Sequence, residues 1–251
     1  MTLDEISNDI TKETPASFEP AIDYVIAKIP RWPFDKFKGN TGELGVQMQS
    51  TGEVMAIGRT IEEALQKAIR SLDIDQEAFE YTEYTDYDLE HATDQRIFQL
   101  YSALKDGRSI DELAKITNIS PFFIHKIKNI VDMEERIEMQ GSSVLYNTKL
   151  FREIKQYGFS DKRIGELIGL DEDSVTNARL ELNLQPEYKM VDTCAAEFEA
   201  KTPYYYGTYD SAPEIIKDDK KKIVVLGAGP IRIGQGIEFD YCFIPNRLWI
   251  M

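Results

Sequence analysis

The chain has 251 residues, 42% of them hydrophobic, which is enough for one large or two ordinary domains with buried cores. Forty-four acidic residues against 29 basic ones give a formal net charge of -15, a balance that repels nucleic-acid backbones. Two cysteines in unrelated contexts, Cys194 and Cys242, favour a reducing compartment, and two histidines leave little material for a histidine-rich metal site. The acidic amino terminus is unlike a signal peptide, and no stretch approaches the ~18 apolar residues of a membrane span. We therefore expect a soluble cytoplasmic protein without nucleic-acid or membrane contacts.

Short elements are predicted in the first 58 residues. The capping-box spacing of Thr2 and Glu5 predicts a helix over residues 3–10. Alternating apolar residues predict a strand over 24–29, which Pro30 should end because proline cannot donate to a ladder. Residues 44–48 and 53–57 also alternate and flank a Ser-Thr-Gly turn, so they predict a β-hairpin.

A well-marked helix follows. Thr60 is a good cap, and Glu63 stands three residues on, as a capping box requires. The next residues place one continuous apolar face toward a core, and this face consists of Ile61, Ala64, Leu65, Ala68, Ile69 and Leu72. Residues 73–90 then carry eight acids and no base, which predicts an exposed connection and a domain boundary near residue 73.

The next hundred residues have helical periodicity. One amphipathic helix is predicted over 97–104, ending near Gly107. Two short helix pairs follow, related by an offset of 51 positions and separated by a helix over 149–157. The offset aligns Ser109 with Ser160, Leu113 with Ile164, Ile116 with Leu167, Ile119 with Leu170, and Ile124 with Val175. The pattern predicts a compact helical domain over about 90–185.

Pro186 should end this domain. A short strand is predicted over 188–192, followed by an irregular aromatic link through Tyr204–Tyr209. Ile223–Leu226 then has the pattern of a buried parallel strand, and a glycine-rich turn containing Gly227, Gly229, Gly234 and Gly236 follows it.

This strand-and-turn unit is typical of nucleotide-binding α/β domains, but two features of a dinucleotide fingerprint are missing. Arg232 occupies the position of the third glycine, and the chain ends before an acidic residue ~20 positions on could appear. A self-contained nucleotide-binding enzyme is disfavoured as well, since one strand makes no sheet. We expect the chain to begin a domain that it does not complete.

Three stretches in the same order resemble the carbamoyl-phosphate synthase large chain family. They are residues 47–60 (QMQSTGEVMAIGRT), 189–198 (KMVDTCAAEF) and 227–241 (GAGPIRIGQGIEFDY). The resemblance implies the end of a first ATP-grasp half over 1–73, a helical oligomerisation or connection domain over 74–214, and the truncated start of a second half over 215–251. The implied fold class is mixed: a central all-α domain flanked by an incomplete α+β tail and one strand-turn-helix unit.

The same resemblance implies a carbon-nitrogen ligase that makes carbamoyl phosphate from bicarbonate, ammonia derived from glutamine, and two ATP, with Mg²⁺ or Mn²⁺. It serves arginine or pyrimidine biosynthesis. The catalytic, nucleotide-binding and metal-binding residues of both halves fall outside this chain, so we expect no catalytic residue, no cofactor and no activity of the chain alone. Its implied partners are a second copy through the helical domain, the rest of the large chain, and the glutaminase small subunit.

The family also implies a set of passage-lining residues. Met48 and Glu53 match positions that line the carbamate passage at the end of the first half, and Gly236 and Glu238 match positions in the second half. From the residues alone, Glu53 would be a solvated turn acid, and Glu238 an acid near a helix start, where the dipole favours it.

Two further expectations concern the departure from the family and an alternative function. Pro245 stands where the family continues with an apolar helix, which indicates a truncated or frame-disrupted coding sequence. The alternative is a helix-turn-helix DNA-binding protein over 109–131, with Lys126 and Lys128 on the recognition helix. The net charge of -15 and the apolar residues 122–124 argue against DNA binding.

Overall fold

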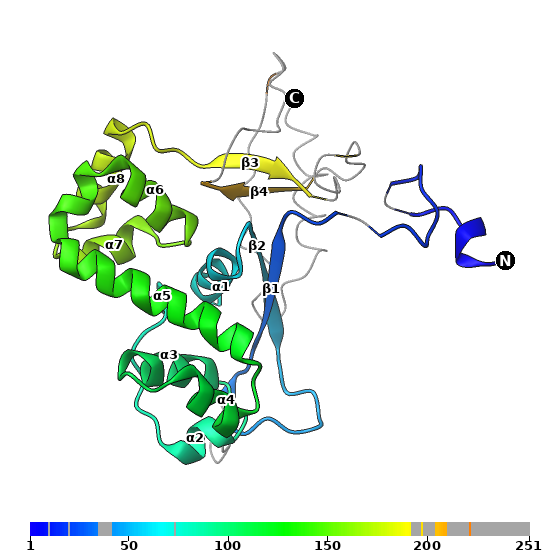
Figure 1. Ribbon diagram of the computed structural model, residues 1–251, viewed down its shortest axis with the longest axis horizontal. Helices are drawn as coiled ribbons and strands as arrows, with labels where there is room; N and C mark the ends of the chain where they lie inside the picture. The colour runs from blue at the N-terminus through cyan, green and yellow to red at the C-terminus, as the bar shows by residue number, and fades with distance from the viewer. Residues whose placement is uncertain are drawn as a thin grey trace, which may run out of the picture.

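The computed structural model describes residues 1–9, 11–19, 21–34, 42–72, 74–191, 197, 204–209 and 221. Within this part of the chain, eight α-helices are flanked by two small antiparallel sheets (Figure 1). The helices are α1 (Ile61–Arg70), α2 (Asp86–Glu90), α3 (Arg96–Lys105), α4 (Ile110–Thr117), α5 (Pro121–Gln140), α6 (Thr148–Gln156), α7 (Asp161–Ile168) and α8 (Glu172–Glu181), and the strands are β1 (Val25–Arg31), β2 (Gly52–Gly58), β3 (Glu187–Met190) and β4 (Tyr205–Thr208). The glycine-rich stretch after Ile223, and Pro245, lie outside the described residues.

The amino-terminal helix is shorter than predicted. Only Leu3–Glu5 is helical, as one 3₁₀ turn, although Thr2 and Glu5 do form the expected capping box. The chain then leaves the helix at Ile6 and folds back, so that Ser7 pairs with Pro15. None of the three helical residues is buried, so no apolar face supports a longer helix here.

The predicted hairpin is wrong, because β2 pairs with β1 rather than with residues 44–48. The register runs from Val25 opposite Gly58 to Arg31 opposite Gly52, so β1 also continues through Pro30. In a two-stranded sheet each strand is an edge, where proline is tolerated. The alternating residues around Met48 form no strand, and its side chain is 88% exposed.

Helix α1 begins as predicted and covers one face of this sheet. Thr60 caps it by accepting a hydrogen bond from the Glu63 amide at 3.1 Å. Val54 and Ala56 of β2 pack with Ala68 and Leu72 in a small apolar cluster. The opposite face of α1 is also buried, and it carries Glu62, Glu63 and Gln66 rather than apolar residues.

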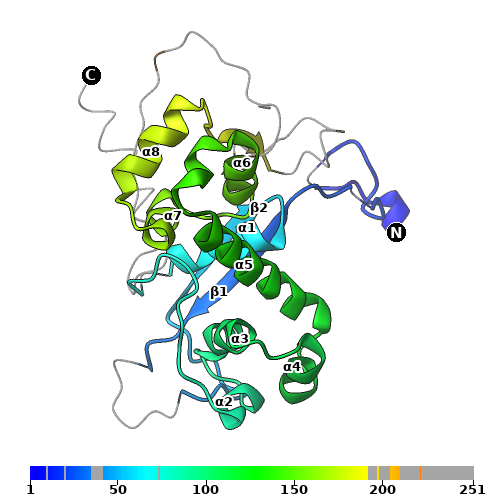
Figure 2. The same cartoon turned by 60° about the vertical axis from the view of Figure 1, so that its left-hand side comes forward.

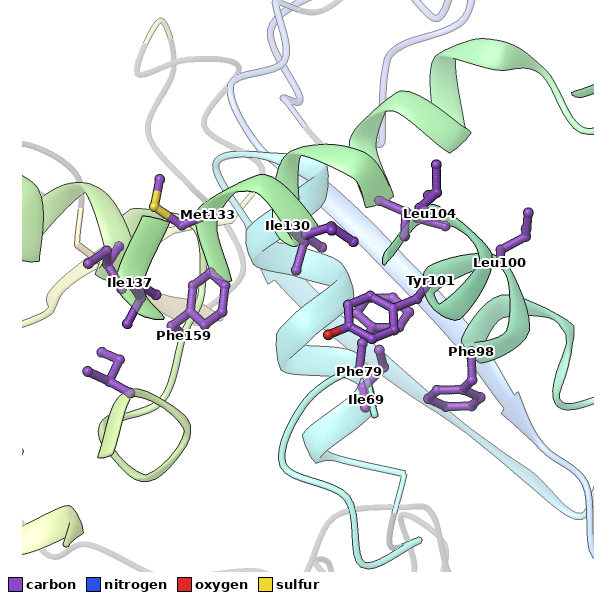
Figure 3. Close-up of a cluster of buried hydrophobic side chains, with 14 of the residues drawn as sticks. Ile69, Phe79, Phe98, Leu100, Tyr101, Leu104, Ile130, Met133, Ile137 and Phe159 are labelled. Atoms are coloured by element: carbon purple, nitrogen blue, oxygen red, sulfur yellow. The ribbon is translucent and has the colours of Figure 1, made fainter. Parts of the chain in front are cut away.

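The acidic stretch from 73 to 90 is not simply an exposed connection. Phe79 and Leu89 within it are fully buried in the main core, together with Ile69 of α1. The Phe79 ring stacks on that of Tyr101, with centroids 5.3 Å apart, as Figure 3 shows. Asp75, Glu80, Glu83, Asp86 and Glu90 are exposed while the apolar residues between them reach the core, so charge density alone was misleading.

The internal repeat is confirmed, and it is longer than predicted. Ser109 and Ser160 cap α4 and α7 in the same way, and each first helix ends in a left-handed residue, Asn118 or Gly169. The offset of 51 also relates α3 to α6, and Gly107 to Gly158, whose φ angles are +88° and +91°. Helix α6 is therefore the first helix of a second three-helix unit, and does not separate two pairs. We name the two units repeat 1 (α3, α4, α5) and repeat 2 (α6, α7, α8).

Helix α5 joins the two repeats. Its 20 residues run from α3 and α4 at one end to α6, α7 and α8 at the other (Figures 1 and 2). Ile130 faces the aromatic cluster of repeat 1, whereas Met133 and Ile137 lie toward Phe159 of repeat 2 (Figure 3). One continuous apolar core therefore extends through both repeats.

The predicted strand after Pro186 is confirmed as β3, but the predicted irregular link is wrong. Tyr205–Thr208 forms β4, which pairs antiparallel with β3 from Glu187 opposite Thr208 to Met190 opposite Tyr205. This ribbon lies beside the end of the β1–β2 sheet and α1 (Figure 1).

Candidate functional site

Two of the four predicted passage residues lie in the described part of the chain. Met48 is exposed and precedes β2. Glu53, near the start of β2, pairs with Lys28 across the sheet, with 2.8 Å between Nζ and Oε1, and more than half of its side chain is exposed. Gly236 and Glu238 lie outside the described residues.

A group of buried polar side chains instead surrounds α1. We call it the polar junction, and its α1 residues are Glu62, Glu63, Gln66, Lys67 and Arg70. Glu62, Glu63 and Gln66 are at most 4% exposed. Burial of such groups costs several kcal/mol unless they are paired, so their partners define how α1 is held.

Glu63 and Lys67 connect α1 to β4. Glu63 Oε2 accepts from the Arg59 amide at 2.8 Å and from the Thr208 hydroxyl at 3.1 Å. Glu63 Oε1 lies 2.6 Å from Lys67 Nζ, and that ammonium also donates to the carbonyls of Ile57, at 3.0 Å, and Gly207. Lys67 thus combines two hydrogen bonds to carbonyls with an ion pair to Glu63.

Gln66 and Arg70 connect α1 to the turn between α6 and α7 in repeat 2. Their side chains donate to the carbonyls of Tyr157, at 2.8 Å, and Gly158, at 2.7 Å. A Cβ at Gly158 would lie 2.9 Å from Glu63 Cα, so only glycine permits this backbone contact. Burial lowers the pKa of Arg70, partly offset by nearby carboxylates.

Glu62 connects α1 to the middle of α5. Its Oε1 accepts from Asn129 Nδ2 at 2.7 Å and lies 3.3 Å from Lys126 Nζ. Lys128, the other lysine of the predicted recognition helix, pairs with Asp132. Both lysines are thus paired with carboxylates, and Ile124 beside them is buried, so the structure does not support the helix-turn-helix hypothesis.

A second buried polar cluster lies where β4 ends. The Tyr209 ring lies 5.0 Å from Lys155 Nζ and 5.9 Å from the Arg179 guanidinium carbon. Both cations bind Asp161 at 2.8 Å, and Thr176 donates to the same carboxylate at 3.0 Å. Burial lowers the pKa of Lys155 to about 8, against the opposing effect of Asp161. Burial alone would raise the pKa of Asp161, but Lys155 and Arg179 hold it below its ordinary value.

Glu134 of α5 links the two repeats. Its carboxylate is fully buried, and it accepts from the Tyr101 hydroxyl of repeat 1 and from Arg163 Nε and Nη2 of repeat 2 at 3.1 and 2.9 Å. Lys105 Nζ lies 3.6 Å away. Burial, followed by the Glu134 charge, raises the pKa of Tyr101.

An apolar cavity of about 560 Å³ lies between β1, α1 and the start of α5. Ile29, Leu65, Ile97 and Phe123 are among its lining residues. No group of three or more potential ligand residues that could hold a metal ion occurs in the described ranges. Among the same residues, no helix is long and apolar enough to cross a membrane.

Sequence reasoning did not find the polar junction. Two acids in the first turn of a helix normally face solvent, where the dipole favours them. The only signal is that residues 62, 63, 66 and 70 recur at helical spacing on the face opposite the apolar one, which is compatible with burial only if specific partners exist.

The fold therefore defines the class of protein. It is a duplicated helical module whose repeats contact the elements that precede and follow them in the sequence. Residues 53–183, just over half of the chain, match the family model described as "Carbamoyl-phosphate synthetase large chain, oligomerisation domain", and the chain belongs to this family. Residues 219–246 match the model described as "Carbamoyl phosphate synthase preATP-grasp domain".

Individual relatives agree with the family. The chain is 62% identical over 248 residues to the carbamoyl phosphate synthase large chain of Methanobrevibacter smithii, covering 99% of this chain and 23% of the relative. It is 62% identical over 244 residues to the protein of the same name from Methanothermobacter thermautotrophicus, covering 97% and 23%. The corresponding protein of Methanothrix thermoacetophila is 55% identical over 251 residues. The chain thus spans about a quarter of the length of these curated relatives.

Proposed function

We propose that this chain is the connecting segment of a carbamoyl-phosphate synthase large chain, which joins two ATP-grasp halves and provides a surface for self-association. The proposed division is residues 1–73 for the end of the first half, 74–214 for the helical oligomerisation domain, and 215–251 for the start of the second half. The main support is that similarity to large chains extends through the helical domain into both flanks.

The complete enzyme would make carbamoyl phosphate from bicarbonate, ammonia released from glutamine by a small subunit, and two ATP with Mg²⁺ or Mn²⁺. In that enzyme Met48, Glu53, Gly236 and Glu238 would line part of the carbamate passage. This role rests on the family resemblance, and Met48 and Glu53 both have exposed side chains. The segment itself would bind neither nucleotide nor metal.

A replacement experiment tests the proposal. The equivalent residues of the Methanobrevibacter smithii large chain are replaced by residues 1–209 of this chain, and ammonia-dependent carbamoyl phosphate formation is measured. We expect the chimera to form carbamoyl phosphate, and the isolated chain to form none. Carbamoyl phosphate formation by the isolated chain would contradict its assignment as a connecting segment, and an inactive, folded chimera would contradict the proposal as a whole.

Self-association is tested separately on the purified chain. Sedimentation equilibrium over a range of concentrations should give an average mass that increases with concentration. A mass that stays at 28.8 kDa throughout would contradict self-association through the helical domain.

A further inference from the structure

Strand β4 is held by residues far away in the sequence. Thr208 bonds to Glu63, 145 positions earlier, and Gly207 bonds to Lys67, 140 positions earlier. These contacts join α1, which precedes repeat 1, directly to β4, which follows repeat 2. They do not pass through the two repeats that separate these elements in sequence.

The contacts are buried and geometrically specific. Glu63 and Thr208 are each 1% exposed, so water cannot replace the hydrogen bond between them. Lys67 Nζ donates to a carbonyl at the end of β2 and to a carbonyl of β4, and it forms an ion pair with the Glu63 carboxylate. Lys67 therefore holds β2 and β4 to α1 at the same time.

Repeat 2 holds Tyr209, the residue that directly follows β4. Gln156 Nε2 donates to the Tyr209 carbonyl at 3.4 Å, and the Tyr209 ring lies against Lys155 and Arg179. Tyr206 is buried as well, and its ring centroid is 5.9 Å from that of Tyr24, just before β1. Residues 205–209 are thus fixed against both α1 and repeat 2.

The place of β4 in the chain gives these contacts a role. The stretch that matches the preATP-grasp domain begins at residue 219, ten positions after Tyr209. The contacts that fix Gly207 and Thr208 therefore limit how far from α1 the following domain can begin.

We propose that Glu63 and Lys67 of α1, with Gly207 and Thr208 of β4, form a clamp that positions the second synthetase half directly against the last helix of the first half. This inference rests on the proposed function. The clamp holds the two halves in register, so that the intermediate formed in one half is used in the other. Glu63 and Lys67 are positioning residues and touch no substrate.

Hydrogen exchange in the purified chain tests the clamp itself. Thr208→Val keeps the side-chain shape but removes the hydroxyl, whereas Thr208→Ser keeps it; Lys67→Met removes all three donors. We expect the amides of β4 to exchange about tenfold faster or more in Thr208→Val and Lys67→Met, because each loses a hydrogen bond to or from a charged group. Thr208→Ser should stay close to wild type. Lys28→Met, which breaks only the exposed pair with Glu53, is the matched control. Unchanged exchange in Thr208→Val and Lys67→Met would overturn the clamp.

The chimeric large chain tests the positioning role. The measured quantity is ATP consumed per carbamoyl phosphate formed. We expect this ratio to rise about twofold or more in Thr208→Val and to return toward wild type in Thr208→Ser. If the unmodified chimera is inactive, the proposed function fails. If it is active and the ratio is unchanged in both Thr208→Val and Lys67→Met, the positioning role fails.

Discussion

Glu134→Gln is the most direct test of what joins the two repeats. The substitution keeps the size of the side chain but removes its charge. The amide has one acceptor oxygen, so it cannot serve both the Tyr101 hydroxyl and the two Arg163 donors at 3.1 and 2.9 Å. Its NH₂ group would then face another donor. With the oxygen turned toward Tyr101, Arg163 would keep only its bond to Glu166, at 3.2 Å.

The expected cost follows from these contacts. Hydrogen bonds to charged groups contribute about 1.5–3 kcal/mol each, and at least one is lost. Breaking a buried ion pair from one side costs about 3–5 kcal/mol, because the remaining charge is left uncompensated. Since Arg163 retains some solvent access, we expect Glu134→Gln to lower the free energy of unfolding by about 3 kcal/mol.

Urea denaturation followed by far-UV circular dichroism measures this change, because the helical signal reports both repeats. The exposed neighbour Glu135→Gln is the control, and it should lie within about 0.5 kcal/mol of wild type. In a double-mutant cycle with Arg163→Met, the two substitutions should couple by more than about 1 kcal/mol. A loss below about 1 kcal/mol, or no coupling, would refute the view that Glu134 joins the repeats.

Three further predictions concern the turn on α1 and the buried cations. Gly158→Ala should cost about 2–3 kcal/mol of unfolding free energy, since the added Cβ would contact the α1 backbone and the residue would also be strained at a positive φ. Gly107→Ala is the control: a Cβ there would have no atom within 4 Å, so this substitution should cost only about 1 kcal/mol. Equal costs would contradict the docking of the Gly158 turn on α1. Because the pKa of Lys155 is lowered to about 8 from 10.5, the unfolded chain binds more protons between these values, and stability relative to Lys155→Met should rise as the pH increases through this window. Since the pKa of Asp161 is lowered, its contribution to stability is complete above the ordinary value of 3.8, and the stability difference between wild type and Asp161→Asn should shrink as the pH falls below that value. Thermal melts at a series of pH values measure the stability of the Lys155 and Asp161 variants relative to wild type. A stability difference that does not change with pH would contradict the corresponding prediction.

Local signals predicted the helical part of the fold well. The serines at 109 and 160 and the apolar residues three or four positions apart are sufficient to place α4 and α7, because caps and amphipathic faces act within one or two turns. The offset of 51 was visible in the sequence for the same reason. The predicted repeat included only the helix pairs and not the match of α3 to α6.

Pairings between distant residues were not predictable from local patterns. Residues 44–48 alternate like a strand, yet β2 pairs with β1, whose Ile29 and Ala27 pack against the same small core. Strand β4 needs β3 as a partner, and the aromatic run at 204–209 carries no turn or period that reveals this pairing. The polar junction was invisible for the same reason, since each buried charge on α1 has a partner at least 60 positions away or in another element.

Of the passage residues, the structure describes only Met48 and Glu53, and their proposed role rests on the family resemblance. The sequence alone favoured a solvated acid at position 53. Its exposed pair with Lys28 agrees with that simpler interpretation.

The long helix α5 has a mechanical consequence. Twenty residues at 1.5 Å each make a rod about 30 Å long, and α1 grips it near its middle, where Glu62 binds Asn129 and Lys126. A stiff helix that is held near its centre can rotate about that point as a rigid body. A small tilt about Glu62 would displace its two ends, and the repeats packed on them, in opposite directions.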